Sequence, residues 1–292
     1  MNKNKFKHFG FIAAFGLASL IPISAFMPNN NIDSPENTFN KSMVQNEMKT
    51  WLKDNRQFLN TLFPNVTKGV NIFAQNESDL YSSVLRKFYH CSPTDIDSRE
   101  CMDINGYSSY FTSRNHEFSS SNNIIIGVKV IDQDYGSISD FLKDKHKLLD
   151  IIFFHEFGHY LLNHYPDEAN DFIAQNNLSY DDAMMLNESF ADTFSIAMMH
   201  YKYPQLDVNE LKTSVIKYRL DGLEINPEHK TFAAVINFEI PEEKDLHKLL
   251  KVCLESSKQT FNYTHKPTST QILSIRDKLQ KLTNKNPKIN TN

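Results

Sequence analysis

The sequence predicts an α+β fold that is mainly helical, with one small sheet and a central apolar helix. Three observations predict this class. Apolar residues recur at helical spacing through most of the chain, a single short run at 124–131 is rich in β-branched residues, and the segment 148–162 is apolar on nearly every side. A helix that is hydrophobic all round belongs in the middle of a domain. We therefore expect the helix that contains 148–162 to lie at the centre of the fold.

The composition excludes several classes of protein. The chain has 292 residues, 40% hydrophobic and 23% charged, with 8 Gly and 11 Pro, which excludes collagen, low-complexity disorder and a multi-span membrane protein. At about 150 residues per domain, this length predicts one or two domains. The net charge of -4, without a basic stripe, excludes nucleic acid as the main partner.

Residues 1–25 have the three parts of a secretory signal peptide. Lysines at positions 3, 5 and 7 precede an uncharged run from Phe9 to Ala25, whose last residue is small enough for cleavage. The alternative is an uncleaved anchor, since the run approaches the ~18 residues of a membrane span, but Pro22 favours cleavage. We expect an exported protein, periplasmic or secreted, with membrane contact only through this segment if it stays uncleaved.

The cysteines fit an oxidising compartment, which export implies. Cys91 and Cys101 bracket a polar, turn-rich segment that a disulfide could close. Cys253 lies in an apolar helical pattern and is expected to be a buried thiol.

The N-terminal part is expected to hold a linker and a helical segment. Residues 26–40 are rich in Asn and Pro and predict a flexible linker, which leads into an N-terminal helical segment at 41–120. Within this segment we expect helices at 42–63 and 77–89, followed by a loop at 91–122.

The remaining chain is expected to form one domain, 121–283, before a disordered tail at 284–292. It should begin with the strand 124–131 and a long helix that starts at Ser137 or Ser139 and ends near Tyr165. After a loop at 166–180, the pattern predicts a helix at 181–203. The last third should be helical apart from a strand at 232–238.

The pattern HExxH, formed by His155, Glu156 and His159, points to chemistry. On a helix the two histidines lie one turn apart on one face, where both imidazoles can bind one Zn²⁺. Glu156 is then placed to take a proton from a water molecule. An ordinary helix with two histidines is the alternative, but burying three ionisable groups without partners would cost several kcal/mol, which favours a metal.

A catalytic zinc site also needs a third protein ligand and an open position. The sequence offers His164, Glu168 and Glu188. Glu188 is favoured because it comes 29 residues after His159, on a helix that can return antiparallel to the first. Asp192, one turn further on, is placed to accept a hydrogen bond from a ligand histidine and fix its tautomer.

These motifs resemble those of a known group of enzymes. The segment HEFGH followed by NESFAD is similar to the gluzincin metallopeptidases, and the ExxAD pattern at 188–192 is most like the HtpX- and Oma-type peptidases and their soluble periplasmic relatives. The resemblance implies a zincin-like catalytic domain, with Zn²⁺ held by two histidines and a glutamate. A rival resemblance is to the ImmA/IrrE-like group, which His164, Ala191 and Phe194 also match.

Hydrolysis also needs a hydrogen-bond donor for the oxyanion. Candidates are His229, Tyr165, Tyr201 and His265. We favour His265, as donor or as gate, because the segment 265–268 resembles the His-Pro segment of the HtpX- and Oma-type group.

The sequence therefore predicts a zinc-dependent endopeptidase that hydrolyses peptides or unfolded proteins in the exported or envelope fraction. The strand 124–131 could pair with an extended substrate, as an edge strand does in gluzincins, or it could be a core strand. An alternative class is an exported, non-proteolytic zinc-binding protein that acts as a binding or chaperone-like module. Autoinhibition, with His265 or the N-terminal segment in the open metal position, is a third hypothesis.

Overall fold

The described part of the chain is mainly helical, as predicted from the sequence. The computed structural model describes residues 41–74, 109–113, 121–126, 144–164, 167–221 and 230–265, together with 270, 273–274, 277–278 and 280–281. The signal peptide, the linker, the helix expected at 77–89, Cys91, Cys101 and the tail at 284–292 lie outside the described residues. No helix among the described residues combines the length and the apolar character that crossing a membrane requires.

The chain divides into two compact units, one from Leu17 to Asp132 and the other containing Gln133–Asn292. The division falls after residue 132, whereas the sequence pattern predicts that the second domain begins at 121. In the described residues, the N-terminal unit holds one helix and three strands, and the C-terminal unit holds helices.

The N-terminal unit pairs helix α1 with a three-stranded sheet. Helix α1 (Lys41–Leu62) matches the helix predicted at 42–63. The sheet has the order β1-β3-β2, with β1 (Val70–Ala74) parallel and β2 (Ser109–Ser113) antiparallel to β3 (Ser121–Ile126). Ile124 and Ile126 are fully buried, as alternation along a strand requires when one face meets the core. Because β3 has neighbours on both sides, it is a core strand and not an edge strand that could pair with a substrate.

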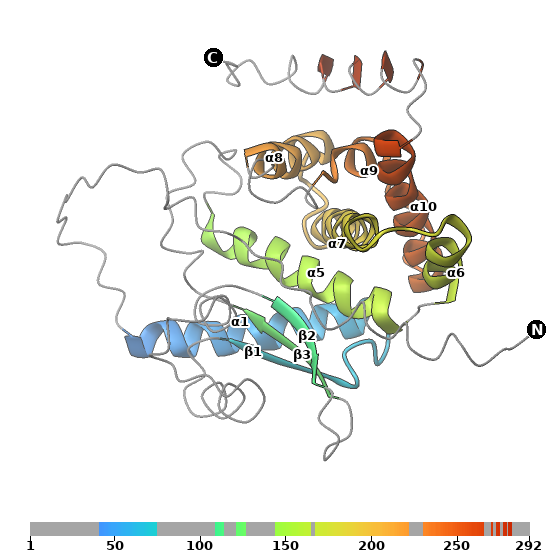
Figure 1. Ribbon diagram of the computed structural model, residues 1–292. Coiled ribbons are helices and arrows are strands. Elements are labelled where there is room, and N and C mark those ends of the chain that lie inside the picture. The colour runs from blue at the N-terminus through green and yellow to red at the C-terminus, as the bar shows by residue number, and fades with distance from the viewer. Residues whose placement is uncertain are drawn as a thin grey trace, which may run out of the picture. The chain divides into compact units, whose positions relative to one another are not determined.

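The C-terminal unit is built around α7 (Tyr180–Lys202). This helix contacts α5 (Lys145–His164), α8 (Val208–Asp221), α9 (Phe232–Asn237) and α10 (Leu246–His265), and Figure 1 shows it enclosed by them. Nearly every residue of α7 after its first two is buried. The central helix is therefore α7, whose bounds agree with the helix predicted at 181–203, and not the HExxH helix α5, for which the sequence predicts that place.

Three local predictions in this unit were wrong. Helix α5 begins at Lys145 and not at 137 or 139, because the Asp144 side chain accepts a hydrogen bond from the His146 amide at 3.0 Å and starts the helix there. The segment expected to be a loop, 166–180, contains helix α6 (Asp167–Asn176).

The segment expected to form the strand 232–238 is helix α9. The Thr231 carbonyl accepts hydrogen bonds from the amides of Ala234 and Val235, which closes a helical turn. Alanine favours helix, and one turn buries all four residues from 233 to 236 against α7, α8 and α10. The middle of the run for which the sequence pattern predicted a strand is therefore buried as a helix.

Candidate metal centre

Helices α5 and α7 approach each other closely at Gly158. A Cβ atom at this position would lie 2.9 Å from the Cα atom of Ala191, so only glycine fits without a shift of the backbone. This contact lies between His155 and His159 on α5 and one turn after Glu188 on α7. The close packing therefore brings the carboxylate of Glu188 to both imidazoles.

His155, His159 and Glu188 form a buried group, which we name the ligand cluster. The two Nε2 atoms lie 3.0 Å apart. His155 Nε2 lies 3.3 Å from Glu188 Oε2, and His159 Nε2 lies 3.5 Å from Glu188 Oε1. Three donor groups thus point at one another from two helices.

The dimensions of the ligand cluster fit a small tetrahedral cation. Ligand atoms bound at about 2.0–2.1 Å to a tetrahedral centre are about 3.3–3.4 Å from one another. The three distances in the cluster, 3.0, 3.3 and 3.5 Å, lie around this value. The chemistry of the donors fits as well, because two imidazoles and one carboxylate are a common set for a catalytic metal.

The buried charges also favour a divalent cation. Glu156, Glu188 and Asp192 are at most 3% exposed, and the buried guanidinium of Arg219 pairs with Glu188 and Asp192. With both imidazoles neutral, as metal ligation requires, three carboxylates against one guanidinium leave an excess of two negative charges, and buried charges need compensation. The ligand cluster could therefore hold a divalent metal ion.

Both imidazoles are oriented through their outer nitrogens. His155 Nδ1 donates to Asp192 Oδ1 at 2.9 Å, and His159 Nδ1 donates to Asn187 Oδ1 at 2.9 Å. A proton held on Nδ1 leaves the lone pair of Nε2 facing the cluster. The two partners, a carboxylate and an amide, therefore select the tautomer that a metal ligand needs.

Asp192 is itself held by two residues outside α5 and α7. Arg219 on α8 donates from Nε to Oδ2 at 2.9 Å and from Nη2 to Oδ1 at 2.7 Å. Thr231, just before α9, donates from Oγ1 to Oδ2 at 2.7 Å. Together with His155, these contacts occupy the accepting capacity of the carboxylate.

The environment shifts the pKa values of the three groups in different directions. Burial lowers the pKa of His159 to about 4, so its imidazole is neutral at neutral pH. Burial also opposes the charged form of His155, but hydrogen bonds to Asp192 and Glu188 outweigh it and raise the pKa to about 9. Burial would raise the pKa of Asp192, yet the Arg219 charge and the His155 contact hold this pKa well below its usual range.

Other candidate residues from the sequence lie elsewhere. His265, on the last turn of α10, contacts the carboxylate of Asp182 on the first turn of α7, and its role toward an oxyanion stays a prediction. His164 is exposed and donates from Nδ1 to the Tyr160 carbonyl. Glu168 is exposed on α6, Tyr201 donates to the Pro241 carbonyl, and Tyr165 and His229 are outside the described residues.

Three residues of the site were missed from the sequence: Asn187, Arg219 and Thr231. Asn187 directly precedes Glu188, and this adjacency to a ligand is a signal that could have found it. Arg219 and Thr231 follow Asp192 by 27 and 39 residues and belong to no local pattern with it. Only the folding of α8 and α9 against α7 brings them there.

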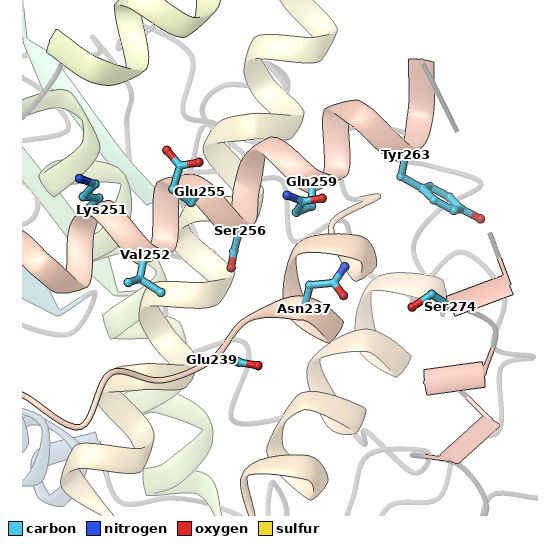
Figure 2. Close-up of a pocket in the computed structure, with 9 residues that line it drawn as sticks. All are labelled: Asn237, Glu239, Lys251, Val252, Glu255, Ser256, Gln259, Tyr263 and Ser274. Atoms are coloured by element: carbon cyan, nitrogen blue, oxygen red, sulfur yellow. The ribbon is translucent and has the colours of Figure 1, made fainter. Parts of the chain in front are cut away.

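A cavity of about 550 Å³ lies apart from the ligand cluster. It is bordered by side chains of α10, most of them polar, together with Asn237, Glu239 and Ser274 (Figure 2). No residue of the ligand cluster lines it. The candidate metal ligands therefore belong to the buried cluster and not to this cavity.

Comparison with known proteins adds no relative. No family model matches the chain, and no curated protein or solved structure matches it either.

Proposed function

We propose that this protein is a zinc-dependent metallopeptidase with a zincin-like arrangement of its C-terminal unit. The observation that carries the proposal is the buried convergence of His155, His159 and Glu188, with Glu156 next to the first histidine on the same helix. HExxH on α5 and Glu188 on α7 supply two imidazoles and one carboxylate for Zn²⁺. A fourth, open coordination position would be left for chemistry.

In the proposed hydrolysis of a peptide bond, different residues bind the metal, orient its ligands and transfer the proton. When bound, Zn²⁺ supplies Lewis acidity that polarises a carbonyl group and makes water more acidic. His155, His159 and Glu188 would hold it, while Asp192 and Asn187 keep the imidazoles in the ligating tautomer. The Glu156 carboxylate takes a proton from the attacking water and returns it to the leaving amine.

The class of substrate follows from the expected location. The secretory signal predicted at residues 1–25 supports export, so the proposed substrates are peptides or unfolded proteins of the exported or envelope fraction. We propose endopeptidase activity, as the resemblance to the HtpX- and Oma-type group implies.

The decisive experiment compares the parent with Glu156→Gln, which keeps the shape of the side chain. Zinc content and cleavage of a disordered protein are measured on both, with Glu168→Gln on the exposed face of α6 as the matched control. We expect equal zinc content in all three proteins and a loss of at least about 100-fold in cleavage for Glu156→Gln alone. Cleavage at the parent rate by Glu156→Gln would show that the mechanism is wrong.

A second candidate function is favoured by the burial of the site. His155 is the most exposed member of the ligand cluster, at 8%, and Glu156 is only 1% exposed, so in the described part of the chain these groups offer a protein substrate little surface. An exported zinc-binding module that captures unfolded partners without cleaving them needs no such surface. Parent protein that binds zinc and prevents aggregation of an unfolded client, but never cleaves it, would establish this alternative.

A further inference from the structure

We propose that Arg219 is a positioning residue of the metal site, which sets the geometry of Glu188 and Asp192 from the neighbouring helix α8. The inference rests on the proposed metal site but not on peptidase activity. Arg219 lies outside both sequence motifs and is 4% exposed.

The contacts of Arg219 join the two carboxylates. Nε and Nη2 form a two-pronged contact with Asp192, at 2.9 and 2.7 Å. Nη2 also donates to Glu188 Oε2 at 3.1 Å. Such fork-shaped contacts fix orientation as well as distance, because the guanidinium is planar and rigid.

This placement lets one guanidinium control two of the three ligands. Glu188 is contacted directly, and His155 is held through Asp192, whose Oδ1 accepts from both Arg219 and His155. The same Nη2 atom lies 3.3 and 3.4 Å from the ring nitrogens of His155, so it also packs against that imidazole.

The chain needs such a group because Glu188 and Asp192 are like charges one turn apart on a buried helix. Like charges at this spacing repel each other, and burial strengthens the repulsion. Arg219 compensates both, and Thr231 adds a neutral donor to the same Asp192 carboxylate. Without this cation the two carboxylates would move apart, and Glu188 would leave its position beside the imidazoles.

If Arg219 affected the metal only through direct charge repulsion, the prediction would be the opposite. A positive charge so close to a divalent cation repels it, so removal of Arg219 would then strengthen metal binding. If Arg219 positions the ligands, its loss weakens binding instead. Arg219→Lys separates the two, because lysine keeps the charge but cannot reproduce the two-pronged contact.

The test measures zinc affinity in the full chain by competition with a chelator of known affinity. The variants are Arg219→Lys and Thr231→Val, and Thr213→Ala is the matched control, since the Thr213 hydroxyl is buried on α8 but bonds the Asn209 carbonyl of its own helix. We expect about 10–100-fold weaker zinc binding for Arg219→Lys, a smaller loss for Thr231→Val and no change for Thr213→Ala. The visible absorption of the Co²⁺-substituted protein should also change for Arg219→Lys, since it reports the ligand geometry.

Zinc binding by Arg219→Lys that equals or exceeds that of the parent would overturn the proposal. Should Arg219→Lys not fold, Thr231→Val decides in its place: affinity equal to the parent would show that anchoring of Asp192 does not govern the site. Because the readout is affinity, a parent protein that binds zinc but cleaves nothing would refute the peptidase proposal and leave this one intact. A parent protein that binds no zinc would refute both.

Discussion

Asp182 caps the N-terminus of α7 and also contacts the C-terminal end of the neighbouring helix α10. Its side chain and that of Ser179 form a capping box: the Asp182 amide donates to Ser179 Oγ at 3.2 Å, and the Ser179 amide donates to Asp182 Oδ2 at 3.3 Å. His265 contacts the other carboxylate oxygen from the end of α10. The histidine expected near the metal thus joins the ends of two helices in this structure.

The Asp182 carboxylate should make the stability of the protein depend on pH in the acid range. Burial raises its pKa, but the Ser179 hydroxyl and His265 outweigh burial and lower this pKa below its ordinary value of 3.8. A lowered pKa contributes stability that is present above the unfolded value and is lost as the pH falls through the folded value. We therefore expect Asp182→Asn to reduce the free energy of unfolding by about 1 kcal/mol near neutral pH, and the difference from the parent to shrink below pH 3.8.

Denaturant unfolding of the metal-free protein at a series of pH values measures this difference. Asp181→Asn is the matched control, because Asp181 lies in the same helical turn but is exposed. The same acid-dependent loss in both variants would mean that general charge near the helix N-terminus, and not the capping box, is responsible.

At the scale of elements, prediction succeeded where the information was local. Helices α1 and α7 were found from apolar spacing followed by a proline just beyond the end, and the buried thiol of Cys253 is confirmed. The short helix α9 was mistaken for a strand because so short an apolar run has no period that distinguishes the two. The HExxH pattern is local to α5, whereas Arg219 joins the site only through the packing of α8 on α7.

The close contact at Gly158 should determine the distance between α5 and α7, and with it the distance between the two histidines and Glu188. Gly158→Ala gains about 1 kcal/mol in helix propensity, but its Cβ would lie 2.9 Å from the Ala191 backbone, and overpacking of this kind costs about 1–3 kcal/mol. We expect a net loss of about 1 kcal/mol in stability and roughly tenfold weaker zinc binding, since the helices must separate. Denaturant unfolding and chelator competition measure the two effects.

A second substitution calibrates the propensity contribution. Ala174 is exposed on α6. The change in the free energy of unfolding for Ala174→Gly therefore measures the difference in helix propensity between alanine and glycine in this protein, without a packing contact. If Gly158→Ala is more stable than the parent by that same amount, with unchanged zinc affinity, close helix packing does not limit the site.

At the scale of the whole molecule, the described residues of the candidate metal site all lie in the C-terminal unit. Its residues come from α5, α7, α8 and the segment before α9, and they are separated by as many as 76 positions, from His155 to Thr231. The N-terminal unit has a core of its own, with Leu59 of α1 and Ile124 of β3 fully buried. A bound cation would therefore cross-link helices of the C-terminal unit and would have no ligand in the described part of the N-terminal unit.

Zinc should stabilise the protein against heat through the C-terminal unit. A ligand that binds only the folded state adds about 2.7 kcal/mol at one hundred times its dissociation constant, which for a unit of this size raises the melting temperature by about 5–10 °C. Calorimetry with added zinc and with chelator measures the shift, and limited proteolysis locates it. Glu188→Gln is the control, because it keeps the shape of the ligand but removes its charge, and its melting temperature should respond little to zinc. An equal shift in Glu188→Gln, or protection confined to the N-terminal unit, would place the stabilising metal somewhere other than the ligand cluster.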